Sequence, residues 1–179
     1  MKKFSCFTLV LALLLLALVS CSGYNKIMRD HLKNSNNYQT REVFLKDFYY
    51  IDPSTNEKKR DFTAQEFSDN DVIFEVSFFN SVEELRPFLG GSPNESIPLE
   101  EYKFQFRVIK SNSKILLTND FFNHITVGEK ISVKVSDFIY MDNNYFYIAQ
   151  LEYNGKEYLT FDEGLKNIVD MMDQNKSLF

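Results

Sequence analysis

Residues 145–161, YFYIAQLEYNGKEYLTF, contain two runs rich in aromatic and β-branched side chains, 145–153 and 156–161. Asn154 and Gly155 separate the two runs. Both residue types accept a positive φ, so this dipeptide favours a two-residue type I′ turn between paired strands. The stretch therefore predicts a β-hairpin near the end of the chain.

Similar short runs precede the hairpin, joined by segments with turn chemistry. We predict strands at residues 43–51, 72–79, 103–108, 114–117 and 131–136. Their number and spacing indicate a mainly β fold, with the second half of the chain forming an antiparallel meander. We expect an antiparallel β-sandwich, with a small partly open β-barrel as the alternative. The sandwich is favoured because no helix is predicted mid-chain, where an OB-type barrel would have one.

The chain is predicted to close with an amphipathic helix at about residues 162–174. Thr160 and Glu163 have the spacing of a capping box, which marks the start of a helix. Apolar residues then recur on one helical face, namely Leu165, Ile168, Val169 and Met172. We expect this face to cover an edge or an open end of the β-structure.

The N-terminus has the features of a secretory signal peptide. Lys2 and Lys3 precede an apolar run over residues 7–19, which is interrupted only by Thr8 and is short for a spanning helix. The run ends in the sequence Leu18-Val19-Ser20-Cys21.

This ending resembles the lipobox of bacterial lipoproteins. The resemblance implies cleavage between Ser20 and Cys21, removal of residues 1–20, and acylation of the Cys21 thiol. It also implies that the lipid bilayer is a partner through the acylated Cys21, since two acyl chains together give stable attachment. We expect an exported protein anchored at the cell membrane or the outer membrane, and facing either the periplasm or the cell surface.

The predicted mature chain is acidic. Lys2 and Lys3 leave with the signal peptide, so 18 of the 20 basic residues remain against 25 acidic ones, a net charge of −7. A domain of this charge is not expected to bind nucleic acid. We expect residues 21–40 to be a lipidated cysteine and tether, and 41–179 to be a single β-rich domain.

No cofactor and no metal site is expected. Cys6 leaves with the signal peptide and Cys21 is acylated, so neither is available as a ligand or for a disulfide. His31 and His124 lie far apart in the sequence without a neighbouring ligand pattern.

Residues 80–101 form the longest predicted irregular segment, and they combine Gly and Pro with apolar side chains. Apolar residues on a long loop either fold back on the core or meet a partner. The candidates for partner contact are Phe88, Leu89, Ile97 and Leu99.

Three functions remain open. The favoured one is a non-catalytic lipoprotein that binds another envelope protein or a small ligand, or that serves envelope structure. An inhibitor or immunity-type lipoprotein against a basic partner would suit the negative charge. A hydrolase of envelope glycans is less favoured, since the chain lacks the usual nucleophile and metal motifs. Its acid–base residues would come from the pairs Glu83 with Glu84, Asp69 with Asp71, or Glu100 with Glu101.

Overall fold

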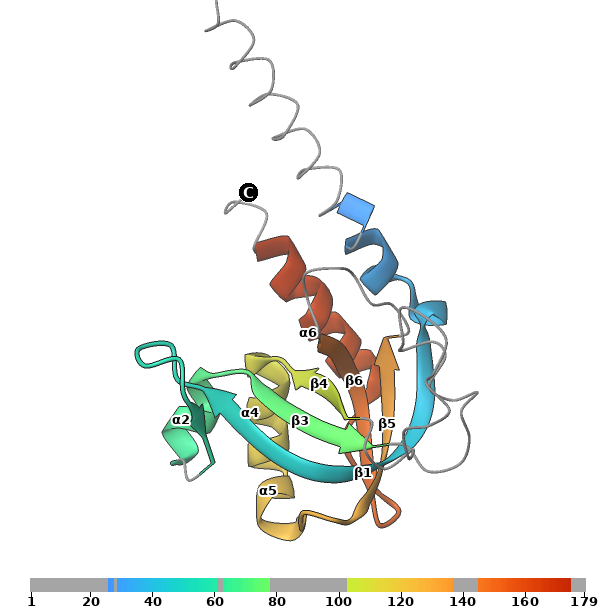
Figure 1. Cartoon of the computed structure of the whole chain (residues 1–179). Helices are drawn as coiled ribbons and strands as arrows, with labels where there is room; N and C mark the ends of the chain where they lie inside the picture. The colour runs from blue at the N-terminus through green and yellow to red at the C-terminus, as the bar shows by residue number, and fades with distance from the viewer. Residues whose placement is uncertain (1–25, 28, 61–62, 78–102, 137–144, 175–179) are drawn as a thin grey trace, which may run out of the picture.

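A computed structural model describes residues 26–27, 29–60, 63–77, 103–136 and 145–174, and five of its strands form a closed barrel (Figure 1). Around the barrel the strands are β1 (Tyr38–Ile51), β3 (Val72–Ser77), β4 (Phe104–Val108), β6 (Tyr145–Tyr153) and β5 (Lys130–Ser136). The barrel closes because β5 pairs with β1. All neighbours are antiparallel except β4 and β6, which pair in parallel.

A helix, α4 (Lys110–Thr118), lies between β4 and β5 in the chain. This strand order, with a helix between the third and fourth barrel strands, is the Greek-key arrangement of OB-type barrels. The mainly β prediction is therefore confirmed, and the structure is the barrel alternative, closed and not partly open. The antiparallel sandwich and the continuous antiparallel meander are not found, because β4 and β6 run in the same direction.

Helix α4 also replaces the strand predicted at 114–117 and the turn expected before it. Its buried residues are Asn112, Ser113 and Leu116, so two of the three are polar and the apolar helical period is hidden in the sequence. The Asn112 amide donates to the carbonyl oxygens of Ile148 and Gly164, at 3.4 and 3.3 Å. These bonds satisfy a polar side chain that is fully buried.

Strand β1 is long because different parts of it pair with two barrel strands, β5 and β3. It pairs with β5 over residues 38–44 and with β3 from Phe44 onward, and its register shifts between Leu45 and Asp47. A bulge of this kind bends a strand and increases its twist, which lets one strand take part in both sides of a small barrel.

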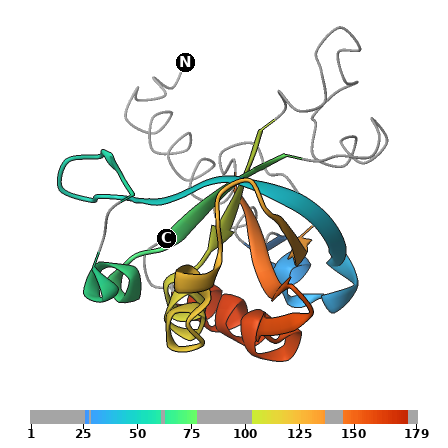
Figure 2. The same cartoon turned by 90° about the horizontal axis from the view of Figure 1, so that it is seen from below.

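The barrel interior is filled by aliphatic and aromatic side chains. Phe74 and Phe106 point inward from β3 and β4 and are fully buried. The short helix α5 (Phe121–His124) adds Phe121, whose ring stacks on Phe74 with 6.0 Å between centroids. Helices α4 and α5 contact each other, with α5 in front of α4 in the view from below (Figure 2), and both contribute to this core.

The predicted hairpin is confirmed. Asn154 and Gly155 have φ angles of 51° and 73°, and they join β6 to β7 (Lys156–Leu159). The predicted C-terminal helix is also confirmed as α6 (Phe161–Gln174), which packs along the outside of β6 with Ile168 buried.

The N-terminal part of the described chain lies against the barrel and α6. Residues 29–33 are helical, and a 3₁₀ turn, η1 (Ser35–Asn37), leads into β1. Leu32 is buried with Tyr38 and Ile168, and the Tyr38 hydroxyl donates to the Leu32 carbonyl oxygen at 3.0 Å. Lys33 pairs with Asp173 of α6 at 3.1 Å. Much of the segment expected to be a tether therefore belongs to the folded domain.

Candidate functional site

The residues expected to contact a partner or lipid lie outside the described part of the chain. These are Phe88, Leu89, Ile97 and Leu99 in the predicted contact loop, and Ser20 and Cys21 at the lipobox. In the sequence, residues 78–102 stand between Ser77 at the end of β3 and Lys103 just before β4. These two strands, together with β1, carry a cluster of polar contacts.

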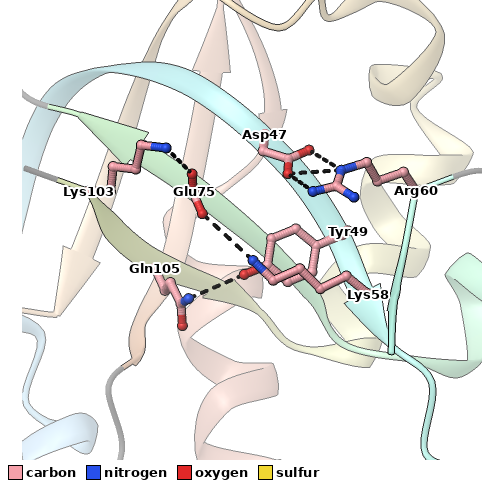
Figure 3. A network of polar contacts seen from close by, with 7 residues as sticks. All are labelled: Asp47, Tyr49, Lys58, Arg60, Glu75, Lys103 and Gln105. Carbon is pink, nitrogen blue, oxygen red and sulfur yellow. Dashed lines mark hydrogen bonds and ion pairs between the residues drawn. The ribbon is translucent and has the colours of Figure 1, made fainter. Parts of the chain in front are cut away.

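This cluster, which we call the charged face, lies on the outer surface of β1, β3 and β4 (Figure 3). It receives further side chains from β2 (Lys58–Lys59), which pairs with the end of β1, and from the residue that follows β2. Its members are Asp47, Tyr49, Lys58, Arg60, Glu75, Lys103 and Gln105.

The bulge in β1 decides which side chains belong to the charged face. Leu45 pairs with Val76 and points into the core, whereas Asp47 pairs with Glu75 and points outward. In a regular strand Leu45 and Asp47, which are two residues apart, would lie on the same side, since side chains alternate with a period of two. The bulge therefore turns Asp47 and Tyr49 away from the core side.

Asp47, Glu75 and Gln105 form a row across three strands, because Glu75 pairs with Asp47 on one side and with Gln105 on the other. Two carboxylates at directly opposite positions repel each other. Cations from outside this row must compensate for the repulsion.

Arg60 compensates for Asp47. Its Nε lies 3.0 and 3.1 Å from the two carboxylate oxygens of Asp47, and its Nη2 lies 2.7 Å from Oδ2. This two-pronged geometry is the strongest form of an arginine–carboxylate pair. The hydrogen bonds to Asp47, followed by its charge, raise the pKa of Arg60 above its ordinary value.

Two lysines compensate for Glu75. Lys103 Nζ lies 3.1 Å from one Glu75 oxygen and Lys58 Nζ lies 3.9 Å from the other. The Lys58 ammonium also sits 4.3 Å from the centre of the Tyr49 ring, a cation–π distance. Gln105 Nε2 donates to the Tyr49 hydroxyl oxygen at 3.2 Å. Tyr49 is buried beneath these cationic side chains.

The cations of the charged face are its outermost groups. The side chains of Lys58, Arg60 and Lys103 are 43, 56 and 57% exposed, whereas those of Asp47 and Glu75 are 20 and 16% exposed. Three positive and two negative groups give this face a net charge of +1, with the positive groups toward solvent. It can therefore offer N–H donors to an anionic group, in a protein that is acidic as a whole.

The pair Asp69 and Asp71, considered for acid–base chemistry, has other partners in the structure. Asp71 accepts hydrogen bonds from Arg107 Nε at 2.7 Å and from the backbone N–H of Lys110 at 2.6 Å, so it caps α4 from another element. A hydrogen bond from Gln65, with Lys110 nearby, lowers the pKa of Asp69. A general acid needs the opposite shift. The other two carboxylate pairs, at 83–84 and 100–101, lie outside the described residues.

The connection between β1 and β3 carries a second polar contact. Helix α2 (Ala64–Asp69) starts with a capping box formed by Thr63 and Glu66, and Glu66 also accepts a hydrogen bond from Tyr50 at 2.9 Å. The bonds from Thr63, chiefly its backbone N–H, lower the pKa of Glu66, whereas burial and then Glu66 itself raise that of Tyr50. The Thr-x-x-Glu spacing at 63–66 was a visible signal for this helix.

The described residues hold no group of three or more His, Cys, Asp and Glu side chains that could bind a metal ion. His31 contacts Asn37, with 2.9 Å between His31 Nδ1 and Asn37 Nδ2. His124 pairs with Asp120 at 3.1 Å on the surface. In the same part of the chain, no helix is long and apolar enough to cross a membrane.

Comparisons of the chain with models of protein families, with curated proteins and with solved structures found no match.

Proposed function

We propose that this protein is a non-catalytic lipoprotein of the bacterial envelope, anchored through Cys21, whose barrel binds an anionic envelope polymer on the charged face. The anchor rests on the resemblance of residues 18–21 to a lipobox. The binding role rests on one observation: the three cations of the charged face are its most exposed groups, and two partly buried carboxylates hold them in place.

The position of the charged face supports a binding role. In OB-type barrels, the outer face of the second and third strands and the adjoining loops bind extended polymers such as oligosaccharides. Here these strands are β3 and β4, which carry Glu75 and Gln105. Fold analogy alone does not define a ligand. The exposed cations of the charged face indicate the class of ligand, because ammonium and guanidinium groups pair with carboxylate and phosphate groups of a polymer.

Three of the described acids are held in their ionised form, which fits binding better than proton transfer. Hydrogen bonds lower the pKa values of Asp52, Glu66 and Asp69, which keeps these carboxylates ionised. Groups that exchange protons in catalysis are instead tuned toward the working pH. A glycan-binding module that does not cleave its ligand is consistent with these shifts.

The anchor is tested by intact mass and membrane partitioning of the native protein beside a Cys21→Ser variant. We expect the wild type to lack residues 1–20, to carry at least two acyl chains and to partition with membranes, and we expect the variant to be soluble. A wild-type protein that is unacylated and soluble would overturn the lipoprotein assignment.

The binding role is tested separately, with polygalacturonate as a carboxylated probe and dextran as a neutral one. A variant with Lys58→Gln and Lys103→Gln should bind polygalacturonate roughly fivefold more weakly, because two ion pairs are lost. The matched control changes Lys130 and Lys156 to Gln, which removes the same charge from cations outside the charged face. Equal weakening in both variants would mean that net charge, and not this face, governs binding.

A further inference from the structure

The proposed anchor leaves little chain between the membrane and the folded domain. Lys26 is the first described residue and lies five positions after Cys21. Five residues span at most about 18 Å when fully extended. An acylated Cys21 would therefore hold the N-terminal helical residues within this distance of the lipid headgroups.

The same end of the domain presents an apolar side chain between cations. Ile27 is 55% exposed, and it is one of only two large hydrophobic residues of the described chain that are strongly exposed. Lys26 beside it is exposed and Arg29 is partly exposed, with Asp30 as the neighbouring acid. A bilayer interface favours this combination, because it accepts an apolar side chain below the headgroups and attracts cations at anionic phosphates.

This end is also fixed to the barrel, so it can orient the domain. Leu32 is buried against Tyr38 and Ile168, and Lys33 pairs with Asp173 of α6 at 3.1 Å. A contact made by Ile27 would therefore be transmitted to the barrel through a packed segment and not through a loose linker.

Resting on the proposed anchor, we infer that Lys26, Ile27 and Arg29 dock on the lipid bilayer, with Ile27 inserted at the interface and the two cations facing the headgroups. One isoleucine cannot hold a protein at a membrane. With Cys21 acylated, however, the local concentration of lipid is high and a weak contact is enough to select one orientation. The end of the domain that carries the N-terminal segment thus faces the bilayer.

A second exposed apolar residue, Val127, provides an internal control for this orientation. Val127, the other strongly exposed large hydrophobic residue, is 51% exposed and lies in the connection between α5 and β5. This connection and the N-terminal helical residues lie at opposite ends of the barrel (Figure 1). If Ile27 faces the membrane, Val127 faces away from it.

Because the chain contains no Trp, single substitutions report on each end without background. We would express the full chain with Ile27→Trp or Val127→Trp, isolate the processed protein, and reconstitute it in vesicles of phosphatidylcholine and phosphatidylglycerol. Both side chains are more than half exposed, so neither change requires the core to repack. Far-UV circular dichroism verifies the fold of each variant.

The readout is Trp emission in vesicles with and without lipids brominated on their acyl chains. We expect the Ile27→Trp emission to shift to the blue and to be quenched at least twofold, and the Val127→Trp emission to remain unshifted and unquenched. Vesicle-bound, acylated protein in which both positions are quenched equally, or neither is, would overturn the orientation and leave the anchor intact. Protein that carries no acyl chain and stays off the vesicles would overturn the anchor and the orientation together.

Discussion

Gly164 in the first turn of α6 is the position where a single added carbon should matter most. A Cβ built on Gly164 would lie 2.0 Å from the carbonyl oxygen of Ala149 in β6, 2.7 Å from the carbonyl carbon and 3.1 Å from Cα. All three are backbone atoms, which cannot rotate away as a side chain can. The helix would have to move outward by about 1 Å or more to restore an ordinary contact.

Two effects of Gly164→Ala oppose each other. Helix propensity alone would stabilise the protein by about 1 kcal/mol. Overpacking of a well-packed contact costs about 1–3 kcal/mol and sometimes more. With the nearest atom at 2.0 Å the steric effect should be at the upper end of that range, so we expect net destabilisation of about 2 kcal/mol.

Urea denaturation followed by far-UV circular dichroism measures this change. For a slope of about 2 kcal/mol per molar, the midpoint should fall by about 1 M. Lys166→Ala in the same helix is the control, since its side chain is 71% exposed and its change should stay within about 0.5 kcal/mol. A midpoint that rises in Gly164→Ala would show that propensity dominates and that α6 does not lie this close to β6.

Three further predictions concern polar contacts. A double-mutant cycle between Glu75→Gln and Lys103→Gln should give a coupling of about 0.5 kcal/mol in urea denaturation, and this coupling should shrink in high salt, because salt screens the 3.1 Å ion pair; a coupling that does not change with salt would contradict this. Asn112→Ala should lower the free energy of unfolding by about 1–3 kcal/mol, because two carbonyl oxygens lose a buried donor; an unchanged urea midpoint would contradict this. The hydrogen bond from Tyr153 to Glu129, aided by burial, raises the pKa of Tyr153. Its stabilisation should be complete below about pH 10 and lost as the pH rises through the raised pKa; tyrosinate absorbance should show that Glu129→Gln lowers this pKa, and identical titrations would refute the assignment.

The strands could largely be predicted because their inward residues alternate. Val72, Phe74 and Val76 are all fully buried in β3, as their spacing indicates. The hairpin at Asn154 and Gly155 was also predictable, since local turn chemistry alone determines it. The order in which the strands close the barrel was not, because it depends on pairings between distant segments.

Helix α4 shows why the sandwich was favoured. Polar Asn112 and Ser113 occupy its buried side. Asn112 donates to the carbonyl oxygens of Ile148 and Gly164, which only the folded chain brings near, whereas Ser113 donates to Val108 just before the helix. Asp71, which caps the helix, comes from a segment about forty residues earlier. A helix whose buried face is polar and whose cap is distant leaves no local signal.

The charged face was missed for a related reason. Asp47, Glu75 and Gln105 all lie on predicted strands, yet they meet only through the register of β1, β3 and β4. That register includes a bulge, and a shift of one residue would turn Asp47 inward. The sequence therefore indicated which residues lie on strands, but not which of them share a surface.

The pairing of β1 with β5 has a consequence for the order of events during biogenesis. Tyr38, at the start of β1, pairs with Ser136, about a hundred residues later in the chain. Contacts between such distant segments make folding slow, because a long loop must close before the contact forms. If the chain is exported N-terminus first, β1 emerges early and waits for β5 and β6 before the barrel can close.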